Sequence, residues 1–142
     1  MCLWRIYSSG DRNGRPYKVV VTIKKSVEFD IVCVKRVLKY IQNIRDAYRT
    51  YKIGHSRELA GNELCHLAIT QIIINLYETK TKMTQETLAR IPRFDRIRLK
   101  TARNIASHDY DSLDFDIVYR ITMQLVSKEV IEELEAVLND SN

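Results

Sequence analysis

LCHLAITQIIINLY, residues 64–77, decides the fold, because its apolar side chains fall on nearly every side of a helix. A helix that is apolar all round is buried among neighbouring helices. This stretch is the middle of a second long helix, expected from Ser56, its N-cap, to about residue 79. The sequence therefore predicts a central helix that the other segments must cover.

The segment before it has the 3.6-residue period of an amphipathic helix. Ser26 can cap its start, Glu28 and Asp30 suit the positive end of the helix dipole, and Gly54 is expected to end it. Its apolar stripe comprises Val34, Val37, Leu38, Ile41, Ile44, Tyr48 and Tyr51.

Four further helices are expected, and their starts are marked by Thr84, Pro92, Asp114 and Ser127. Pro92 ends the short helix capped by Thr84 and begins a longer one, from Arg93 to about Ser107. Because short connections favour antiparallel neighbours, the sequence predicts an all-α antiparallel helical bundle over residues 26–142.

Residues 1–25 follow a different pattern. Gly10, Gly14 and Pro16 separate two β-prone runs, LWRIY and YKVVVTI, which indicates a β-hairpin. Because a lone hairpin is marginal in water, it would have to pack on the helices or on a partner. A disordered N-terminal arm, or an upstream extension, is the alternative.

The charge, the lack of long apolar runs and the cysteine content indicate which class of protein this is. The 142 residues carry 23 Lys and Arg against 18 Asp and Glu, and this net charge of +5 permits an anionic partner without requiring one. No apolar run of about 18 residues and no signal-peptide pattern is present, so a cytoplasmic protein with no membrane partner is expected. Cys2, Cys33 and Cys65 are odd in number and widely spaced, which predicts reduced thiols.

The sequence lacks the common motifs for metals and nucleotide cofactors. It contains no C-x-x-C, H-E-x-x-H, G-x-x-x-x-G-K or G-x-G-x-x-G pattern. Cys65 and His66 are adjacent and point about 100° apart on a helix, so they are unsuited to sharing a metal. We expect His66 in the core, His55 in a loop, and neither a metal nor a cofactor.

The stretch RIPRFDRIRLKTARNIASHDYDSLD, residues 90–114, has the most unusual chemistry. On one continuous helix over residues 93–107, an arc of about 80° contains Arg93, Arg96, Lys100 and Arg103. The opposite arc contains Phe94, Leu99, Ala102, Ile105 and Ala106, with Arg98 misplaced among them. A basic face of this kind suits a polyanion such as RNA. The alternative is a solvated face that the acidic last helix neutralises.

Arg103, Asn104, His108 and Tyr110 cluster where this helix should end. Since Asp109 disfavours further helix, we expect His108 on an exposed turn, where an imidazole titrates near neutrality and transfers protons. An arginine beside it supplies a fixed positive charge for a phosphate. These groups fit hydrolysis of RNA without a metal.

The pattern R-x4-H-x-Y, residues 103–110, resembles the HEPN superfamily and, within it, the HepT-like toxin family of bacteria and archaea. The likeness extends over about residues 29–138, with Pro92 and Phe94 before the motif and DFDIV, residues 114–118, after it. Two features depart from the family pattern. The second helix has AITQIIINLYE where relatives have an I-G-E-A-like stretch, and the segment up to about residue 25 has no counterpart.

The resemblance implies a HEPN-like bundle that forms a homodimer, brings two R-x4-H motifs into one cleft and acts as a metal-independent endoribonuclease. Arg103 and His108 would be catalytic, and Asn104 would order the motif. RNA would be guided by Arg93, Arg96 and Lys100. A cognate minimal nucleotidyltransferase antitoxin would adenylylate Tyr110, which adds bulk and negative charge in the cleft.

Two other functions stay open. A non-catalytic HEPN adaptor would bind RNA or a nucleotidyltransferase without cutting. A DNA-binding regulator would place the helix over residues 93–107 in a major groove, which leaves the turn with His108 and Tyr110 without a role.

Overall fold

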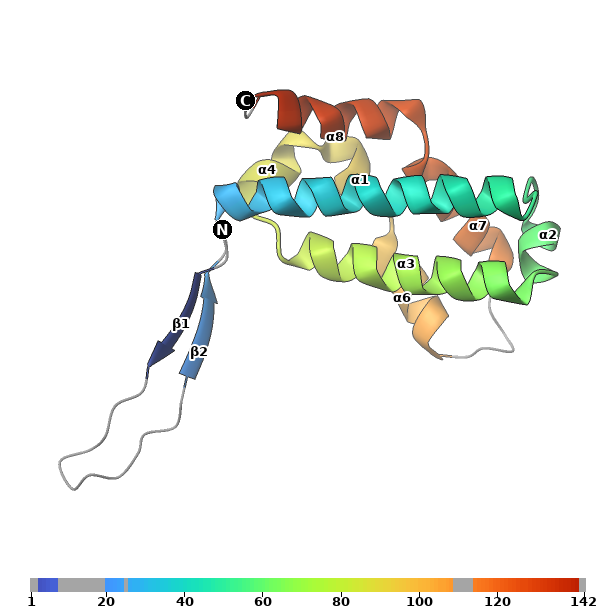
Figure 1. Ribbon diagram of the computed structural model, residues 1–142, viewed down its shortest axis with the longest axis horizontal. Helices are drawn as coiled ribbons and strands as arrows, with labels where there is room; N and C mark the ends of the chain where they lie inside the picture. The colour runs from blue at the N-terminus through green and yellow to red at the C-terminus, as the bar shows by residue number, and fades with distance from the viewer. Residues whose placement is uncertain (1–2, 8–19, 25, 109–113, 141–142) are drawn as a thin grey trace, which may run out of the picture.

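The computed structural model describes residues 3–7, 20–24, 26–108 and 114–140. Its strands are β1 (Leu3–Tyr7) and β2 (Val20–Lys24). Its helices are α1 (Val27–Thr50), α2 (Ser56–Ala60), α3 (Glu63–Thr81), α4 (Gln85–Arg90), α5 (Pro92–Asp95), α6 (Leu99–His108), α7 (Phe115–Leu125) and α8 (Lys128–Asp140). The helices form a bundle, which confirms the predicted all-α class (Figure 1).

The core lies between α1 and α3, which run side by side (Figure 1). From α1 it receives most of the predicted stripe, in which Val34, Val37, Ile41 and Ile44 are at most 1% exposed. Tyr51 was wrongly included in that stripe, because it is the C-cap of α1 and is 40% exposed. From α3 it receives Cys65, Ile69, Ile73 and Leu76, all fully buried. Helix α6 packs on α3, whereas α8 packs on α1 and α5. Each helix therefore buries one stripe of apolar side chains.

Helix α3 is less enclosed than predicted. Its residues Leu64 and Leu67 are 68% and 39% exposed, so the helix is not covered on every side. The segment also breaks into two helices, because α2 ends at Ala60 and Asn62 caps a new helix by accepting a hydrogen bond from the Cys65 amide at 3.0 Å. The prediction of one continuous helix from residue 56 to about 79 is wrong.

The predicted N-cap residues are confirmed at the starts of three helices. The side chains of Ser26, Thr84 and Asp114 each accept a hydrogen bond from a backbone amide at the start of α1, α4 and α7. The end of α1 was misplaced, because the helix stops at Thr50, before Gly54. Lys52 makes the turn there, with a φ of 56°.

A buried carboxylate joins the start of α1 to the start of α4. Asp30 is fully buried, and its oxygens accept hydrogen bonds from the Thr84 amide at 3.0 Å, the Thr84 hydroxyl at 2.5 Å and the Thr87 hydroxyl at 2.6 Å. Because a buried charge is stabilised only when its acceptor sites are filled, these contacts fix the place of α4 beside α1.

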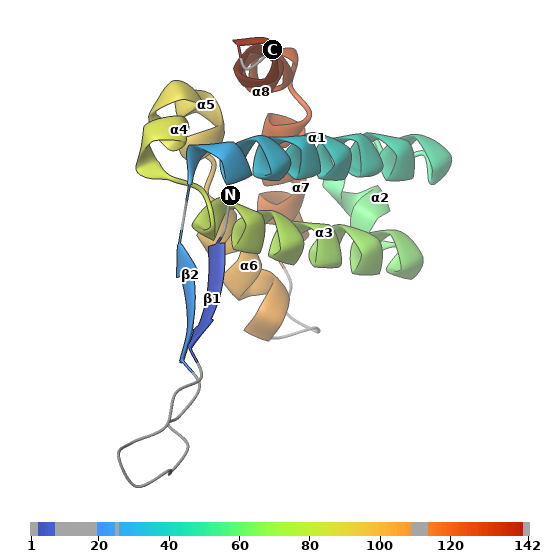
Figure 2. The same cartoon turned by 60° about the vertical axis from the view of Figure 1, so that its left-hand side comes forward.

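Strands β1 and β2 pair antiparallel, from Leu3 opposite Lys24 to Tyr7 opposite Val20. This pairing corresponds to the hairpin alternative for the N-terminal segment. The hairpin leads into the start of α1 and extends beyond the helices, as Figures 1 and 2 show. In the described part of the chain, no helix is long and apolar enough to cross a membrane.

Candidate functional site

The predicted basic helix over residues 93–107 is broken in the structure. Helix α5 ends at Asp95 and α6 begins at Leu99. The reason is that Ile97 and Leu99 are 6% and 1% exposed, although two residues two positions apart point about 200° apart on a helix. Only an interrupted helix lets both side chains enter the core. The break also explains Arg98, which lies between them and is exposed.

The helical face predicted for the basic residues is therefore wrong. Arg93 lies on α5, Arg96 is the C-cap of α5, and Lys100 and Arg103 lie on α6. The apolar half of the prediction is confirmed for four of its five residues, since Phe94, Leu99, Ala102 and Ala106 are buried, whereas Ile105 is half-buried. The DNA-binding alternative loses the recognition helix on which it depended.

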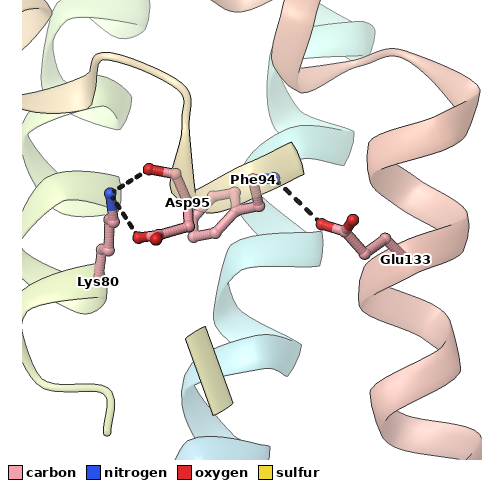
Figure 3. Close-up of polar contacts among 4 residues, drawn as sticks. All are labelled: Lys80, Phe94, Asp95 and Glu133. Carbon is pink, nitrogen blue, oxygen red and sulfur yellow. Dashed lines mark hydrogen bonds and ion pairs between the residues drawn. The ribbon is translucent and has the colours of Figure 1, made fainter. Parts of the chain in front are cut away.

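Helix α5 is held from two sides, as Figure 3 shows. From α3, Lys80 Nζ donates to the Asp95 carbonyl oxygen at 2.8 Å and pairs with Asp95 Oδ1 at 3.2 Å. From α8, the Glu133 carboxylate accepts hydrogen bonds from the backbone amides of Arg93 at 3.2 Å and Phe94 at 3.1 Å. The Phe94 ring is fully buried beneath. A four-residue helix is thus given a fixed position.

The carboxylates nearby are engaged elsewhere. Asp95 pairs with Lys80, Asp140 pairs with Arg90 at 2.8 Å, and Glu133 binds backbone amides. Within the described part of the chain, no ion pair involves the exposed side chains of Arg93, Arg96, Arg98 and Lys100. Helix α8 therefore pairs with the basic segment at Arg90, and within the described residues it forms no ion pair with these four exposed cations.

Three of these cations line one groove. We call it the α5–α6 groove; it has a volume of about 720 Å³, and its lining includes Tyr77, Lys80, Asp95, Arg96, Arg98 and Lys100. Clustered guanidinium and ammonium groups attract phosphate oxygens, and arginine binds them in a bidentate manner. The structure thus brings Arg96 and Lys100 together as predicted residues, and it adds Lys80 and Arg98.

Arg103 lies next to this groove. Its guanidinium carbon is 4.9 Å from the centre of the Tyr77 ring, which itself lines the groove. A cation over an aromatic face is stabilised by the ring quadrupole, so this contact orients Arg103. Both Arg103 and Asn104 are half-buried.

His108 is the last residue of α6. Its side chain and the whole of Tyr110 lie outside the described residues, so the exposed turn and the Arg103–His108 pair stay predictions. On a helix, positions 103 and 108 are about 140° apart and about 7.5 Å apart along the axis.

A second pocket was not foreseen from the sequence. We call it the α7 pocket; it has a volume of about 840 Å³, and its lining includes Arg93, Arg96, Asp116, Tyr119, Arg120 and Met123. These residues come from α5 and its C-cap and from α7. No sequence motif marks them, because they meet only when these helices pack. One partial signal exists, since Arg120 interrupts the apolar run of α7.

His55 and Ser56 form one wall of the α7 pocket. The sequence predicted Ser56 as the cap of this helix and His55 in a loop, but the roles are exchanged. His55 caps α2, because its Nδ1 accepts a hydrogen bond from the Arg57 amide at 3.1 Å. Ser56 is buried and donates a hydrogen bond to Asp116 Oδ1. Ser56 Oγ also lies 3.4 Å from His55 Nδ1, but that nitrogen already accepts from the Arg57 amide, and Asp116 contacts the serine rather than the histidine. A nucleophilic serine needs the reverse order, so these three residues are not a catalytic triad.

The described residues considered from the sequence as metal ligands or free thiols lie outside the α5–α6 groove and the α7 pocket. Among the described residues, no three His, Cys, Asp or Glu side chains are grouped to hold a metal ion. His66 is half-buried and stacks on Phe115, with ring centres 4.9 Å apart. Cys33 and Cys65 are buried, and burial raises the pKa of the Cys65 thiol, which keeps it neutral.

No family model, no curated protein and no solved structure matches this chain.

Proposed function

We propose that the chain is a metal-independent endoribonuclease, the toxin of a HEPN/nucleotidyltransferase pair that acts in the cytoplasm. One observation carries the proposal. The α5–α6 groove holds Arg96, Arg98 and Lys100 without carboxylate partners among the described residues, and Arg103 of the R-x4-H motif lies on Tyr77 at its side. A polyanion that enters the groove passes close to Arg103.

The chemistry follows from the residues at the end of α6. The 2′-oxygen of RNA attacks the adjacent phosphorus and the P–O5′ bond breaks, which leaves a 2′,3′-cyclic phosphate and a 5′-hydroxyl. One group must take the 2′-hydroxyl proton and another must protonate the leaving oxygen. His108 supplies one of them, and Arg103 stabilises the negative charge that develops on the non-bridging phosphoryl oxygens.

A homodimer supplies the second proton-transfer group. Each motif has one histidine, whereas the reaction needs two proton transfers. Since positions 103 and 108 also diverge by about 140° around α6, one motif alone makes a poorly convergent site. Two motifs in one cleft bring two histidines and two arginines to a single phosphodiester.

The direct test compares the wild-type protein with His108→Ala. We expect the wild type to cleave single-stranded RNA in EDTA, and we expect His108→Ala to lose about 100-fold or more in rate, because a general acid–base group contributes at least that factor. Denaturing gels measure the rate. Lys39→Ala is the control and should cleave normally, since Lys39 is exposed on α1 and lines neither of the two sites. Equal RNA patterns for wild type and His108→Ala would refute the catalytic role.

The proposed regulation acts through Tyr110. With ATP and a cognate minimal nucleotidyltransferase, the mass of the protein should rise by one or more AMP units, because the tyrosine hydroxyl is the acceptor. Intact-protein mass spectrometry measures the shift. Tyr110→Phe should abolish it, and Tyr51→Phe, at an exposed tyrosine that lines neither of the two sites, should not. A shift that persists in Tyr110→Phe places the modification elsewhere.

A non-catalytic adaptor is the second candidate. The contact of Arg103 with Tyr77 favours it, because a half-buried arginine on an aromatic ring also serves packing. Such an adaptor would bind RNA with a steep dependence on salt, and the RNA would stay intact.

A further inference from the structure

The α7 pocket combines a positive end with an apolar wall. Its lining includes three arginines, Arg93, Arg96 and Arg120, and one carboxylate, Asp116. Among the described residues no ion pair involves these arginines, and Asp116 accepts the hydrogen bond of Ser56. The three guanidinium groups are exposed and ready to bind an anion of more than one charge.

The apolar wall is supplied mainly by α7. Tyr119 is half-buried, and Met123 is 43% exposed although methionine is an apolar residue. A polarizable thioether beside an aromatic ring suits contact with a flat ring system. Ile97 and Val130, both buried, extend this wall. An inorganic anion alone would leave the whole surface uncovered.

We propose that the α7 pocket binds a nucleoside phosphate, with the phosphate on Arg93, Arg96 and Arg120 and the base against Tyr119 and Met123. The volume of about 840 Å³ is within the range of small-molecule sites, about 300–1,000 Å³. None of the described side chains of α6 lines the pocket, so binding here does not require cleavage at Arg103 and His108.

Two sources share this chemistry. One is a free mononucleotide, and the other is the phosphorylated end of an RNA chain. Arg96 lines both the α7 pocket and the α5–α6 groove, so a chain that ends in the pocket can continue along the groove.

Isothermal titration calorimetry on the full-length His108→Ala protein tests the site, because this variant leaves RNA uncut. At constant ionic strength, AMP should bind at least about tenfold more tightly than adenosine or inorganic phosphate, since only AMP fills both halves. Arg120→Gln should weaken AMP binding about tenfold. Arg45→Gln, an exposed arginine of α1 outside the pocket, is the matched control and should leave the Kd unchanged.

Two outcomes would overturn the proposal. If inorganic phosphate binds as tightly as AMP, the apolar wall contributes nothing to binding. If Arg120→Gln leaves the Kd for AMP unchanged, AMP does not bind in the α7 pocket. Competition identifies the source once AMP binds. An RNA oligonucleotide with a 5′-phosphate that displaces AMP more strongly than its 5′-hydroxyl form indicates an RNA end, and no displacement by either indicates a free nucleotide.

Discussion

Arg103→Ala is expected to lower the rate of RNA cleavage by about 100- to 1000-fold, the usual cost of removing one group that stabilises transition-state charge. The loss has two parts. On the proposed mechanism the variant loses the guanidinium that stabilises the phosphoryl oxygens, and it also loses the contact of that group with the Tyr77 ring at 4.9 Å.

Two further variants separate these parts. Arg103→Lys keeps the charge but loses the planar fork, so it should recover only a fraction of the rate. Tyr77→Leu keeps Arg103 but removes the ring beneath it, and we expect a smaller loss, about tenfold, with the RNA affinity nearly unchanged. Single-turnover cleavage and separate binding measurements give the two quantities.

Arg36→Ala is the control, because Arg36 is exposed on α1 and lines neither of the two sites described here. It should cleave at the wild-type rate. If Arg103→Ala binds and cleaves RNA as the wild type does while it keeps its thermal stability, then Arg103 has no catalytic role. If the wild type binds RNA without cleaving it and Arg103→Ala binds RNA equally well, the protein is a non-catalytic adaptor.

Asp30→Ala is expected to lower the free energy of unfolding by about 3 kcal/mol, a large part of the stability of a domain this size. The side chain is fully buried and accepts three hydrogen bonds, from the amide and hydroxyl of Thr84 and the hydroxyl of Thr87. Alanine leaves these donors buried without an acceptor, and each unsatisfied donor costs about 1–3 kcal/mol.

Urea denaturation followed by circular dichroism measures the change. Asp46→Ala is the matched control on the same helix, because Asp46 is exposed and accepts one hydrogen bond, from Gln42. It should change the free energy of unfolding by less than about 0.5 kcal/mol. Asp30→Asn should fall between the two, since an amide oxygen still accepts. An Asp30→Ala protein as stable as Asp46→Ala would show that the network contributes little.

Local signals were enough for much of the fold. Ser26, Thr84 and Asp114 were recognised as caps, because a short polar side chain before an apolar period has one dominant use. The inward face of α1 followed from periodicity alone, as the buried residues Val34, Val37 and Ile41 show. Such features depend on neighbours three or four residues away, which a single sequence displays.

The sites depended on contacts between distant segments. The sequence singled out Arg96, Lys100 and Arg103 but placed them on one helix, and it missed Arg120 and Tyr119 altogether. The grouping in the α7 pocket arises because α2 and α5 pack near α7, about 20 to 60 residues away along the chain. The hydrophobic period within one helix does not indicate which distant helices will lie beside it.

The sequence by itself determined that the chain is helical, where most helices begin, and which residues carry positive charge. Tertiary structure alone decided where the helices break, at Asn62 and between Asp95 and Leu99, and therefore which cations share a groove. The reason is physical. A helical period is set by hydrogen bonds within one segment, whereas a break is favourable only when side chains on both sides of it, here Ile97 and Leu99, find a core supplied by other helices.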